Sequence, residues 1–314
     1  MRVLVTGGAG FIGSHLVAAL VAQGESVRVL DNFRTGRLEN LTGLDVEVIE
    51  GDIGDEKVIQ TAVAQCDTVF HLAAMVSVPE SVQNPGLNQR INVNGTFNVF
   101  EAARVAGVKR VIYSSSSAVY GDLPQLPARE ESFPTPISPY GAAKWMNEIM
   151  AESYRITFGL EAIGLRYMNV FGPRQDPSSP YSGVLSIFCR AAINGSEVTI
   201  YGDGTQTRDF VFVEDVVSAN LLAAQLPASE MPKKPIFNVG RGEQTAVNEI
   251  VEMLSELVRR PFSTTYAPER PGDIRHSVAD IDKARTILGF RPKVTVLDGL
   301  QTTLEWFRLN PPSL

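Results

Sequence analysis

The fold of this chain is decided by residues 3–16, which read VLVTGGAGFIGSHL. An apolar run leads there into three glycines spaced three residues apart, Gly7, Gly10 and Gly13, and a helical pattern follows. Such glycines allow a tight turn, a close approach of the backbone to a pyrophosphate, and close packing of the helix against the strand. The N-terminus of the helix offers free N–H groups and the positive end of its dipole to the anion. The stretch therefore predicts a strand–turn–helix unit that binds a dinucleotide.

Outward from this stretch, short β-branched runs alternate with longer helical patterns. The runs are almost wholly apolar rather than alternating, as burial on both faces of a parallel sheet requires. This alternation predicts an α/β fold with a Rossmann-type doubly wound parallel sheet. The expected strands are Arg2–Thr6, Ser26–Asp31, Val46–Glu50, Thr68–Leu72, Arg110–Ser114, Ala162–Asn169, Asp209–Val213 and Pro235–Val239. The expected helices are Ile12–Gln23, Glu56–Val63, Asn92–Ala106, a helix from about Tyr140, Val247–Arg259 and Leu297–Arg308.

The distribution of prolines and glycines indicates how the chain is divided. Five prolines fall between residues 121 and 139, which predicts a loop that covers a cleft. After Phe171 the pattern loosens again, and glycines and prolines crowd together. We predict an NAD-binding domain over residues 1–170 with return segments at about 209–240, and a smaller, mainly substrate-binding domain over 171–314.

Composition narrows the range of partners. The 314 residues carry a net charge of −7, so nucleic acid and anionic membranes are not expected to bind. No apolar run approaches the roughly 20 residues of a membrane span, and the N-terminus reads as a strand rather than a signal peptide. Two cysteines and three histidines show no metal-ligand spacing. A cytoplasmic protein without a metal is the expectation.

Asp31 indicates which dinucleotide binds. It ends the second expected strand, 18 residues after Gly13, where a carboxylate accepts hydrogen bonds from a ribose and repels a 2′-phosphate. NAD is therefore favoured over NADP, although Arg34 and Arg37 nearby could weaken this preference. Alternatively, Asp31 only starts a turn. Asp52, after the third expected strand, would contact the adenine or simply cap the strand end.

Tyr140 and Lys144 are candidates for acid–base chemistry. They are four residues apart, so both lie on one face if the segment is helical. An ammonium near a phenol favours phenolate and lowers a pKa that is normally about 10, which makes the tyrosine a usable general base or acid. The same spacing also occurs on solvated helix surfaces. The serine tract 114–117, at the end of an expected strand, lies where open α/β sheets place ligands and catalytic groups, or else forms a polar turn.

With these pieces in view, the chain resembles the extended short-chain dehydrogenase/reductase family, and within it the nucleotide-sugar epimerases. The resemblance covers essentially the whole chain. It rests on TGGAGFIG (6–13), Asp67 with HLAA (71–74), NVNGT (92–96), SSSSAVYG (114–121), Tyr140 with Lys144, LRYMN (165–169), GDGTQTRDF (202–210) and RPGD (270–273).

This resemblance implies Ser116, Tyr140 and Lys144 as catalytic residues, NAD as cofactor, and a homodimer formed through paired helices. The implied cofactor contacts are Gly7, Gly10, Phe11, Ile12, Gly13, Asp31, Asn32, Asp52, Ile53, Leu72, Ala73, Ala74, Asn92, Ser114, Tyr140, Lys144 and Tyr167.

The implied substrate is a UDP-sugar, held beside Ser116. Arg208 and Arg270 are the strongest candidates for its diphosphate, because a guanidinium binds phosphate bidentately, although either could form a surface ion pair instead. The resemblance adds Asn169 at the diphosphate, Asp273 at a ribose, and a uracil lined by Gly183, Val184 and Tyr201.

The residues after Ser116 suggest which reaction follows. The family's 4,6-dehydratases and xylose-forming decarboxylases carry an acid there, whereas this chain reads Ser-Ala-Val-Tyr at 117–120. The resemblance thus implies inversion at C4 through a transient 4-keto sugar. The alternatives are a UDP-glucuronic acid 4-epimerase, with Ser117 near the carboxylate, a one-way NADPH-dependent reductase, which Asp31 disfavours, and a non-catalytic NAD-binding protein.

Two further positions bear on substrate width and cofactor retention. Ser277 falls where members restricted to glucose and galactose have a tyrosine, which implies that UDP-N-acetylglucosamine is accepted beside UDP-glucose. Alternatively, Ser277 only caps the turn before Val278. Val76 stands where some close epimerases place a lysine near the cofactor, which implies weaker retention of NAD.

Overall fold

The computed structural model describes residues 1–176, 183–269 and 274–310. Its centre is a seven-stranded parallel sheet in the order β11-β6-β5-β4-β1-β2-β3. From β1 the chain adds β2 and β3 on one side, and then β4, β5 and β6 on the other side. Open sheets of this kind bind ligands at the switch point between β1 and β4. The strands of this sheet are β1 (Arg2–Thr6), β2 (Ser26–Asp31), β3 (Val46–Glu50), β4 (Thr68–His71), β5 (Arg110–Ser116), β6 (Glu161–Tyr167) and β11 (Ile236–Val239).

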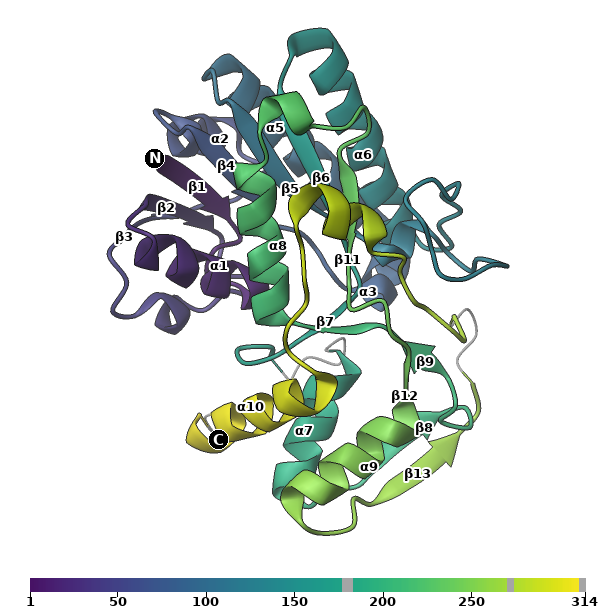
Figure 1. The fold of residues 1–314 in the computed structure, drawn as a ribbon. Coiled ribbons are helices and arrows are strands. Elements are labelled where there is room, and N and C mark those ends of the chain that lie inside the picture. The colour runs from purple at the N-terminus through teal and green to yellow at the C-terminus, as the bar shows by residue number, and fades with distance from the viewer. Residues whose placement is uncertain (177–182, 270–273, 311–314) are drawn as a thin grey trace.

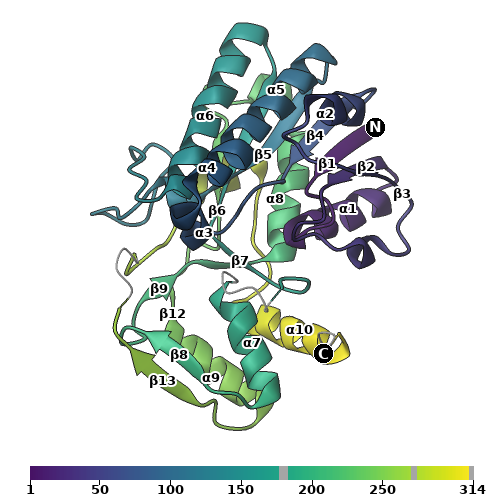
Figure 2. The same ribbon diagram turned by 180° about the vertical axis from the view of Figure 1, so that it is seen from behind.

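Helices cover both faces of the sheet, as the almost wholly apolar strands predicted (Figures 1 and 2). On one face lie α1 (Phe11–Ala22) and α8 (Val213–Gln225), and on the other lie α2 (Glu56–Val63), α5 (Thr96–Val105) and α6 (Pro139–Phe158). The short helices α3 (Val78–Gln83) and α4 (Pro85–Asn88) lead through a π-type turn, η2 (Gln89–Gly95), into α5. Every helix in the described residues is too short or too polar to span a bilayer.

A smaller body lies below the sheet in Figure 1 and is built around a second apolar core. Phe188, Leu254 and Leu304, from three different helices, are buried there. Short strand pairs complete this body: β8 with β13 is parallel, and β9 with β12 is antiparallel. Its elements are α7 (Val184–Asn194), β8 (Val198–Tyr201), β9 (Thr207–Arg208), β12 (Thr245–Ala246), α9 (Val247–Val258), β13 (Thr264–Ala267) and α10 (Val296–Leu309).

Most expected elements form within one or two residues of the predicted bounds, and three differences affect the site. Strand β5 runs on to Ser116, two residues beyond the predicted end. The strand predicted over 162–169 is interrupted at Met168, and residues 169–171 form a separate strand, β7 (Asn169–Phe171). That strand pairs with β10 (Phe210–Phe212) outside the main sheet, so the predicted strand at 209–213 does not join the sheet either.

The chain returns to the large sheet twice. Helix α8, which was not predicted from the sequence, packs against it, and strand β11 joins its edge. Residues 278–290, placed by prediction in the substrate domain, also come back, since Ala279, Ile281 and Leu288 pack into the core that contains α1 and α8. The second return joins both bodies of the molecule. The predicted domain boundaries remain a prediction.

Candidate active site

The glycine turn connects β1 to α1 and leaves no room for side chains. Gly7 has a φ of +70°, and a Cβ there would lie 2.7 Å from the backbone nitrogen of Ala73. At Gly13 a Cβ would lie 2.1 Å from the carbonyl oxygen of Gly7. Among the described residues no side chain caps α1, and its first turn, from Phe11 and Ile12 onward, contains no acidic residue. This turn fits a dinucleotide pyrophosphate, because the N–H groups of α1 are left to an anion.

Asp31 holds the glycine turn as well as ending β2. Its carboxylate accepts hydrogen bonds from the backbone N–H groups of Ala9 and Phe33, both at 2.9 Å. The side chain is buried, and burial raises the pKa of this carboxyl despite the two N–H donors. The carboxylate is therefore held in one place, where it could accept a hydrogen bond from a ribose. The ribose contact itself remains a prediction.

The polar groups near the predicted adenosine end are paired with one another. Asn32 donates to a carboxylate oxygen of Asp52 at 2.6 Å, so these two predicted cofactor residues are adjacent. Arg34 is paired with Glu80, and Arg37 with a carboxylate oxygen of Asp176 at 2.9 Å. Arg34 and Arg37, which from the sequence could weaken the preference for NAD, are therefore both paired with carboxylates.

The structure brings the three predicted catalytic residues together at the carboxyl end of β5. The phenol of Tyr140, at the start of α6, lies close enough to the Ser116 hydroxyl for that hydroxyl to lower its pKa. One turn further along α6, the Lys144 ammonium donates to the carbonyl oxygen and the hydroxyl of Ser114, at 2.8 and 3.1 Å. Tyr140 and Lys144 are both buried, so the group is shielded from bulk water.

The predicted lowering of the Tyr140 pKa is not what the structure shows. Burial raises the pKa of this phenol, and the nearby Ser116 hydroxyl offsets only part of the effect. Lys144 points to Ser114 instead, with its nitrogen 5.8 Å from the centre of the Tyr140 ring. Burial also lowers the pKa of Lys144 to about 8. Desolvation outweighs charge pairing here, because both ionisable groups lie in the protein interior.

Other predicted cofactor residues shape the loops around this site. Asn92 holds the backbone N–H and carbonyl of Met75, and so fixes the loop after β4 that contains Leu72, Ala73 and Ala74. Ile53 is buried against Gly95. Tyr167 pairs with Ser116 across neighbouring strands, but its hydroxyl donates to Asn220 on α8. That hydroxyl is therefore engaged with the protein, and any cofactor contact of Tyr167 has to come from its ring.

A pocket of about 260 Å³ opens in the smaller body. Four of the predicted substrate residues line it: Asn169, Val184, Tyr201 and Arg208. Its other lining residues were not predicted from the sequence. The motif at 202–210 was a signal for one of them, Gln206. The missed residues are Phe188, Thr199, Ile200, Gln206, Val247, Glu269, Ile274 and Arg275.

The remaining predicted substrate positions have different outcomes. Gly183 lies directly before α7, and Ser277 donates its backbone N–H to the carbonyl oxygen of Thr207, beside Arg208, without lining the pocket. Arg270 and Asp273 lie outside the described residues.

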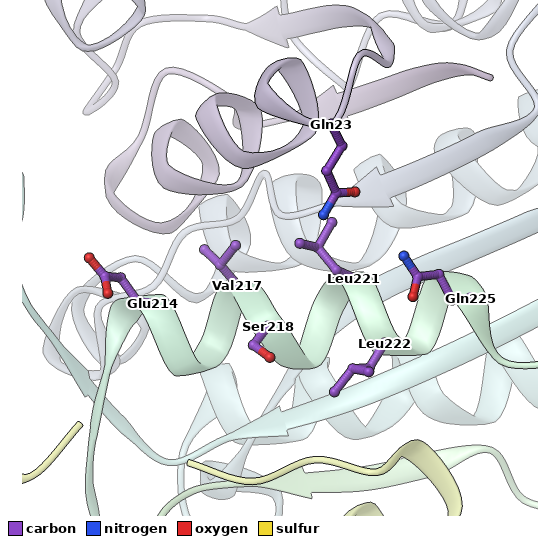
Figure 3. Close-up of a pocket in the computed structure, with 7 residues that line it drawn as sticks. All are labelled: Gln23, Glu214, Val217, Ser218, Leu221, Leu222 and Gln225. Atoms are coloured by element: carbon purple, nitrogen blue, oxygen red, sulfur yellow. The ribbon is translucent and has the colours of Figure 1, made fainter. Parts of the chain in front are cut away.

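A second hollow, of about 330 Å³, lies between α1 and α8 and is separate from this site (Figure 3). Gln23 faces it from the end of α1, and Val217 and Leu221 from α8. None of the predicted catalytic, cofactor or substrate residues lines it. Within residues 1–176, 183–269 and 274–310, no three His, Cys, Asp or Glu side chains gather where they could hold a metal ion.

The doubly wound sheet and the glycine turn define a Rossmann-type dinucleotide-binding protein. The model of the NAD dependent epimerase/dehydratase family matches residues 3–240, and the chain belongs to this family. The predicted fold, family resemblance and NAD cofactor are thereby confirmed.

Relatives match over nearly the full length. A UDP-glucose 4-epimerase of Mycolicibacterium smegmatis is 41% identical, over 98% of this chain and 99% of that protein. The crystal structure of a Thermotoga maritima UDP-glucose 4-epimerase with UDP-glucose superposes with a TM-score of 0.94, at 41% identity and with 98% and 99% of the chains covered. The structure of a UDP-N-acetylglucosamine 4-epimerase from Methanobrevibacter ruminantium, in complex with UDP-N-acetylmuramic acid, superposes with a TM-score of 0.93, at 39% identity and with 98% of both chains covered.

Proposed function

We propose that this protein inverts C4 of a UDP-hexose in an NAD-dependent reaction that passes through a transient 4-keto sugar. The observation that carries the proposal is the buried contact of Ser116 with Tyr140, and of Lys144 with Ser114, at the carboxyl end of β5. The likeness to UDP-glucose and UDP-N-acetylglucosamine 4-epimerases supports this choice of reaction. UDP-glucose/UDP-galactose is the first proposed substrate pair, and UDP-GlcNAc/UDP-GalNAc the second.

The residues of the site have distinct proposed roles. When bound, NAD accepts a hydride from C4 of the sugar and later returns it. Tyr140 takes the proton of the 4-hydroxyl group and gives it back, while Ser116 orients the phenol and the sugar oxygen. Lys144 keeps a positive charge beside Ser114 below a pH of about 8, because its pKa is lowered to that value. Presenting the opposite face of the keto sugar before the hydride returns inverts C4.

The surroundings of Ser116 favour return of the hydride over elimination. The turn at Ser117–Val119 contains no carboxylate that could remove a proton from C5. The pocket lined by Asn169, Tyr201 and Arg208 would take the nucleotide, with Arg208 at the diphosphate. A UDP-glucuronic acid 4-epimerase would share all of these features, so it is kept as an arm of the first experiment.

That experiment follows C4 inversion by proton NMR with UDP-glucose, UDP-N-acetylglucosamine or UDP-glucuronic acid as substrate. Inversion of the first two is expected. Inversion of the glucuronic acid alone would favour the alternative, and no inversion of any substrate, with NAD supplied, would contradict the proposal. Each reaction is run with and without added NAD, because Val76 is exposed in the place of a lysine and predicts weak retention.

Ser277→Tyr is expected to narrow the substrate range. Although Ser277 does not line the pocket, its backbone is hydrogen-bonded to Thr207, next to Arg208, so the longer phenol side chain is expected to reach space that an N-acetyl group needs. The kcat/KM for UDP-N-acetylglucosamine should then fall about 10- to 200-fold, while that for UDP-glucose changes little. Steady-state kinetics with both substrates measures this. Ser196→Tyr, at an exposed turn of the same body, is the control. Equal losses for the two substrates would contradict the assigned role of Ser277.

We also propose that the protein is a homodimer formed through α5 and α6. These helices lie side by side (Figure 2) and expose apolar side chains that a soluble monomer would leave in water. Met146, Ile149 and Ile156 on α6 are 47%, 56% and 68% exposed, and Phe97 on α5 is 46% exposed. A two-fold axis would place this surface against its own copy.

Ile149→Glu is accordingly expected to convert a dimer into a monomer, because it would bury a charge in the apolar contact. Light scattering during gel filtration measures the mass of each species. Leu38→Glu, at a similarly exposed position away from α6, should leave the dimer intact. A wild-type protein that is monomeric at all concentrations would contradict the proposed dimer.

A further inference from the structure

Three consecutive serines at the end of β5 each hold one residue of α6. Ser114 accepts a hydrogen bond from Lys144, and Ser116 lies beside the phenol of Tyr140 and lowers its pKa. Between them, the hydroxyl of Ser115 donates to a carboxylate oxygen of Glu148 at 2.6 Å. The α6 residues are 140, 144 and 148, four apart, so they form one stripe along the helix. Glu148 is the member of this stripe that the proposed reaction does not use.

Arg166 holds Glu148 from the neighbouring strand. Its guanidinium donates two bonds to the two carboxylate oxygens, at 2.8 and 2.7 Å, in a bidentate arrangement. Both side chains are almost completely buried, with 3% and 4% exposed. Arg166 stands directly opposite Ser115 in the parallel pairing of β6 with β5. Glu148, Arg166 and Ser115 are thus joined by short bonds whose directions are fixed by a helix and two strands.

The row continues toward the proline-rich loop and the second return segment. Asn238 on β11 stands opposite Arg166, and its side-chain amide donates to the carbonyl oxygens of Ala128 and Asp280. Tyr120 lies beneath the Arg166 guanidinium, 4.7 Å away, and donates its hydroxyl to Asn238. Ala128 belongs to the proline-rich loop, and Asp280 to the second return segment. One buried polar row therefore connects β5 to both.

Stability alone is a poor explanation for an ion pair at this depth. Removing two charges from water is so unfavourable that a buried ion pair can often be replaced by apolar residues of similar volume with no loss of stability. Removing only one partner is different, because it leaves an uncompensated buried charge. What apolar residues cannot supply is direction, since a bidentate pair is made in one geometry only.

We propose that Glu148 and Arg166 are positioning residues for catalysis, which hold α6 in the register with β5 that aligns Tyr140 with Ser116 and Lys144 with Ser114. The geometry assigns them this role because the Glu148 carboxylate touches both the central serine and the neighbouring strand. The inference rests on the proposed function, in which Tyr140 and Ser116 act on the sugar.

The decisive variant replaces the whole pair, as Glu148→Leu with Arg166→Met, so that no buried charge is left behind. Ser115→Ala is the milder variant, because it keeps the pair and removes only its contact with β5. The control is the pair Arg110 and Glu161, which joins the same two strands at their other end and is also largely buried. Its replacement, Arg110→Met with Glu161→Leu, perturbs the strands far from the serines.

Five quantities are measured for each protein: Tm, the Kd of NAD, kcat and KM with UDP-glucose, and the titration of Tyr140. The last is followed as phenolate absorbance against a matching Tyr140→Phe protein, and does not depend on turnover. In Glu148→Leu/Arg166→Met, kcat should fall about 10- to 100-fold. Tm, the Kd of NAD and KM should change little, and the Tyr140 titration should move. Ser115→Ala should show a smaller change in the same direction, and the control variant should keep kcat and the titration.

A double variant with wild-type kcat and an unmoved Tyr140 titration would overturn the inference. So would losses that affect kcat, KM and the Kd of NAD in proportion to a lower Tm, since these indicate a purely structural role. If the double variant does not fold, Ser115→Ala at wild-type Tm decides by the same two readouts. A wild-type protein that inverts no UDP-sugar contradicts the proposed function instead, and the titration still tests the positioning role.

Discussion

Replacing Tyr140 by phenylalanine is expected to lower kcat about 10²- to 10⁴-fold and to leave the Kd of NAD unchanged. The substitution removes only the hydroxyl that lies beside Ser116, while the ring keeps its buried place at the start of α6. The variant therefore loses the group that moves the 4-hydroxyl proton but keeps the cofactor site. Kinetics with UDP-glucose and a fluorescence titration with NAD give the two numbers.

A matched control exists on the same helix. Tyr154 is also largely buried, and its hydroxyl donates to Glu101 on α5, away from the catalytic serine. Tyr154→Phe should keep kcat near that of the wild type. Full activity in Tyr140→Phe would show that another group moves the proton, and the proposed mechanism would then be wrong. A matching loss in both variants would point to general damage of α6 instead.

Gly13→Ala is expected to abolish NAD binding at concentrations that saturate the wild-type protein. The added methyl carbon would lie 2.1 Å from the carbonyl oxygen of Gly7, and 2.9 Å from both the Gly7 carbonyl carbon and the Gly8 Cα atom. These neighbours are backbone atoms, so no side-chain rotation relieves the overlap and the turn itself has to open. An open turn no longer presents the N–H groups of α1 to a pyrophosphate.

Isothermal titration with NAD measures this effect, and circular dichroism checks that the sheet still forms. Gly86→Ala is the control, because a Cβ at that position meets nothing within 4 Å. It should bind NAD as the wild type does. Undiminished NAD affinity in a folded Gly13→Ala protein would show that the cofactor is not held by this turn.

Local patterns were sufficient to predict the dinucleotide-binding half of the fold. Spacing alone predicted the turn at Gly7 and Gly13, since only a residue without a side chain fits such a close approach of backbone segments. The apolar runs predicted parallel strands covered on both faces, and the structure has this arrangement. The spacing of Tyr140 and Lys144 on a helix was likewise readable, because the helical period is a local property.

Contacts between distant segments could not be read in this way. The tertiary structure decided that Lys144 points to Ser114 and that burial raises the pKa of Tyr140, in contrast to the lowering expected from a nearby ammonium. Desolvation depends on everything packed around a group, and a sequence motif does not contain that information. The same holds for the buried pair of Glu148 and Arg166, which joins a helix to a strand across 18 residues of the chain.

The sequence by itself determined the sheet and the glycine turn, because these follow from periodicity and from what glycine alone permits. Its motifs and their family resemblance indicated the cofactor and the candidate catalytic residues. Only the tertiary structure decided how the substrate pocket is assembled, with Asn169 and Arg208 on different strands and Arg275 contributed by a late segment. It also decided that residues 278–290 return to the sheet and meet Asn238. The physical reason is that packing and desolvation are sums over residues far apart in the chain, whereas turns and helices form from neighbours.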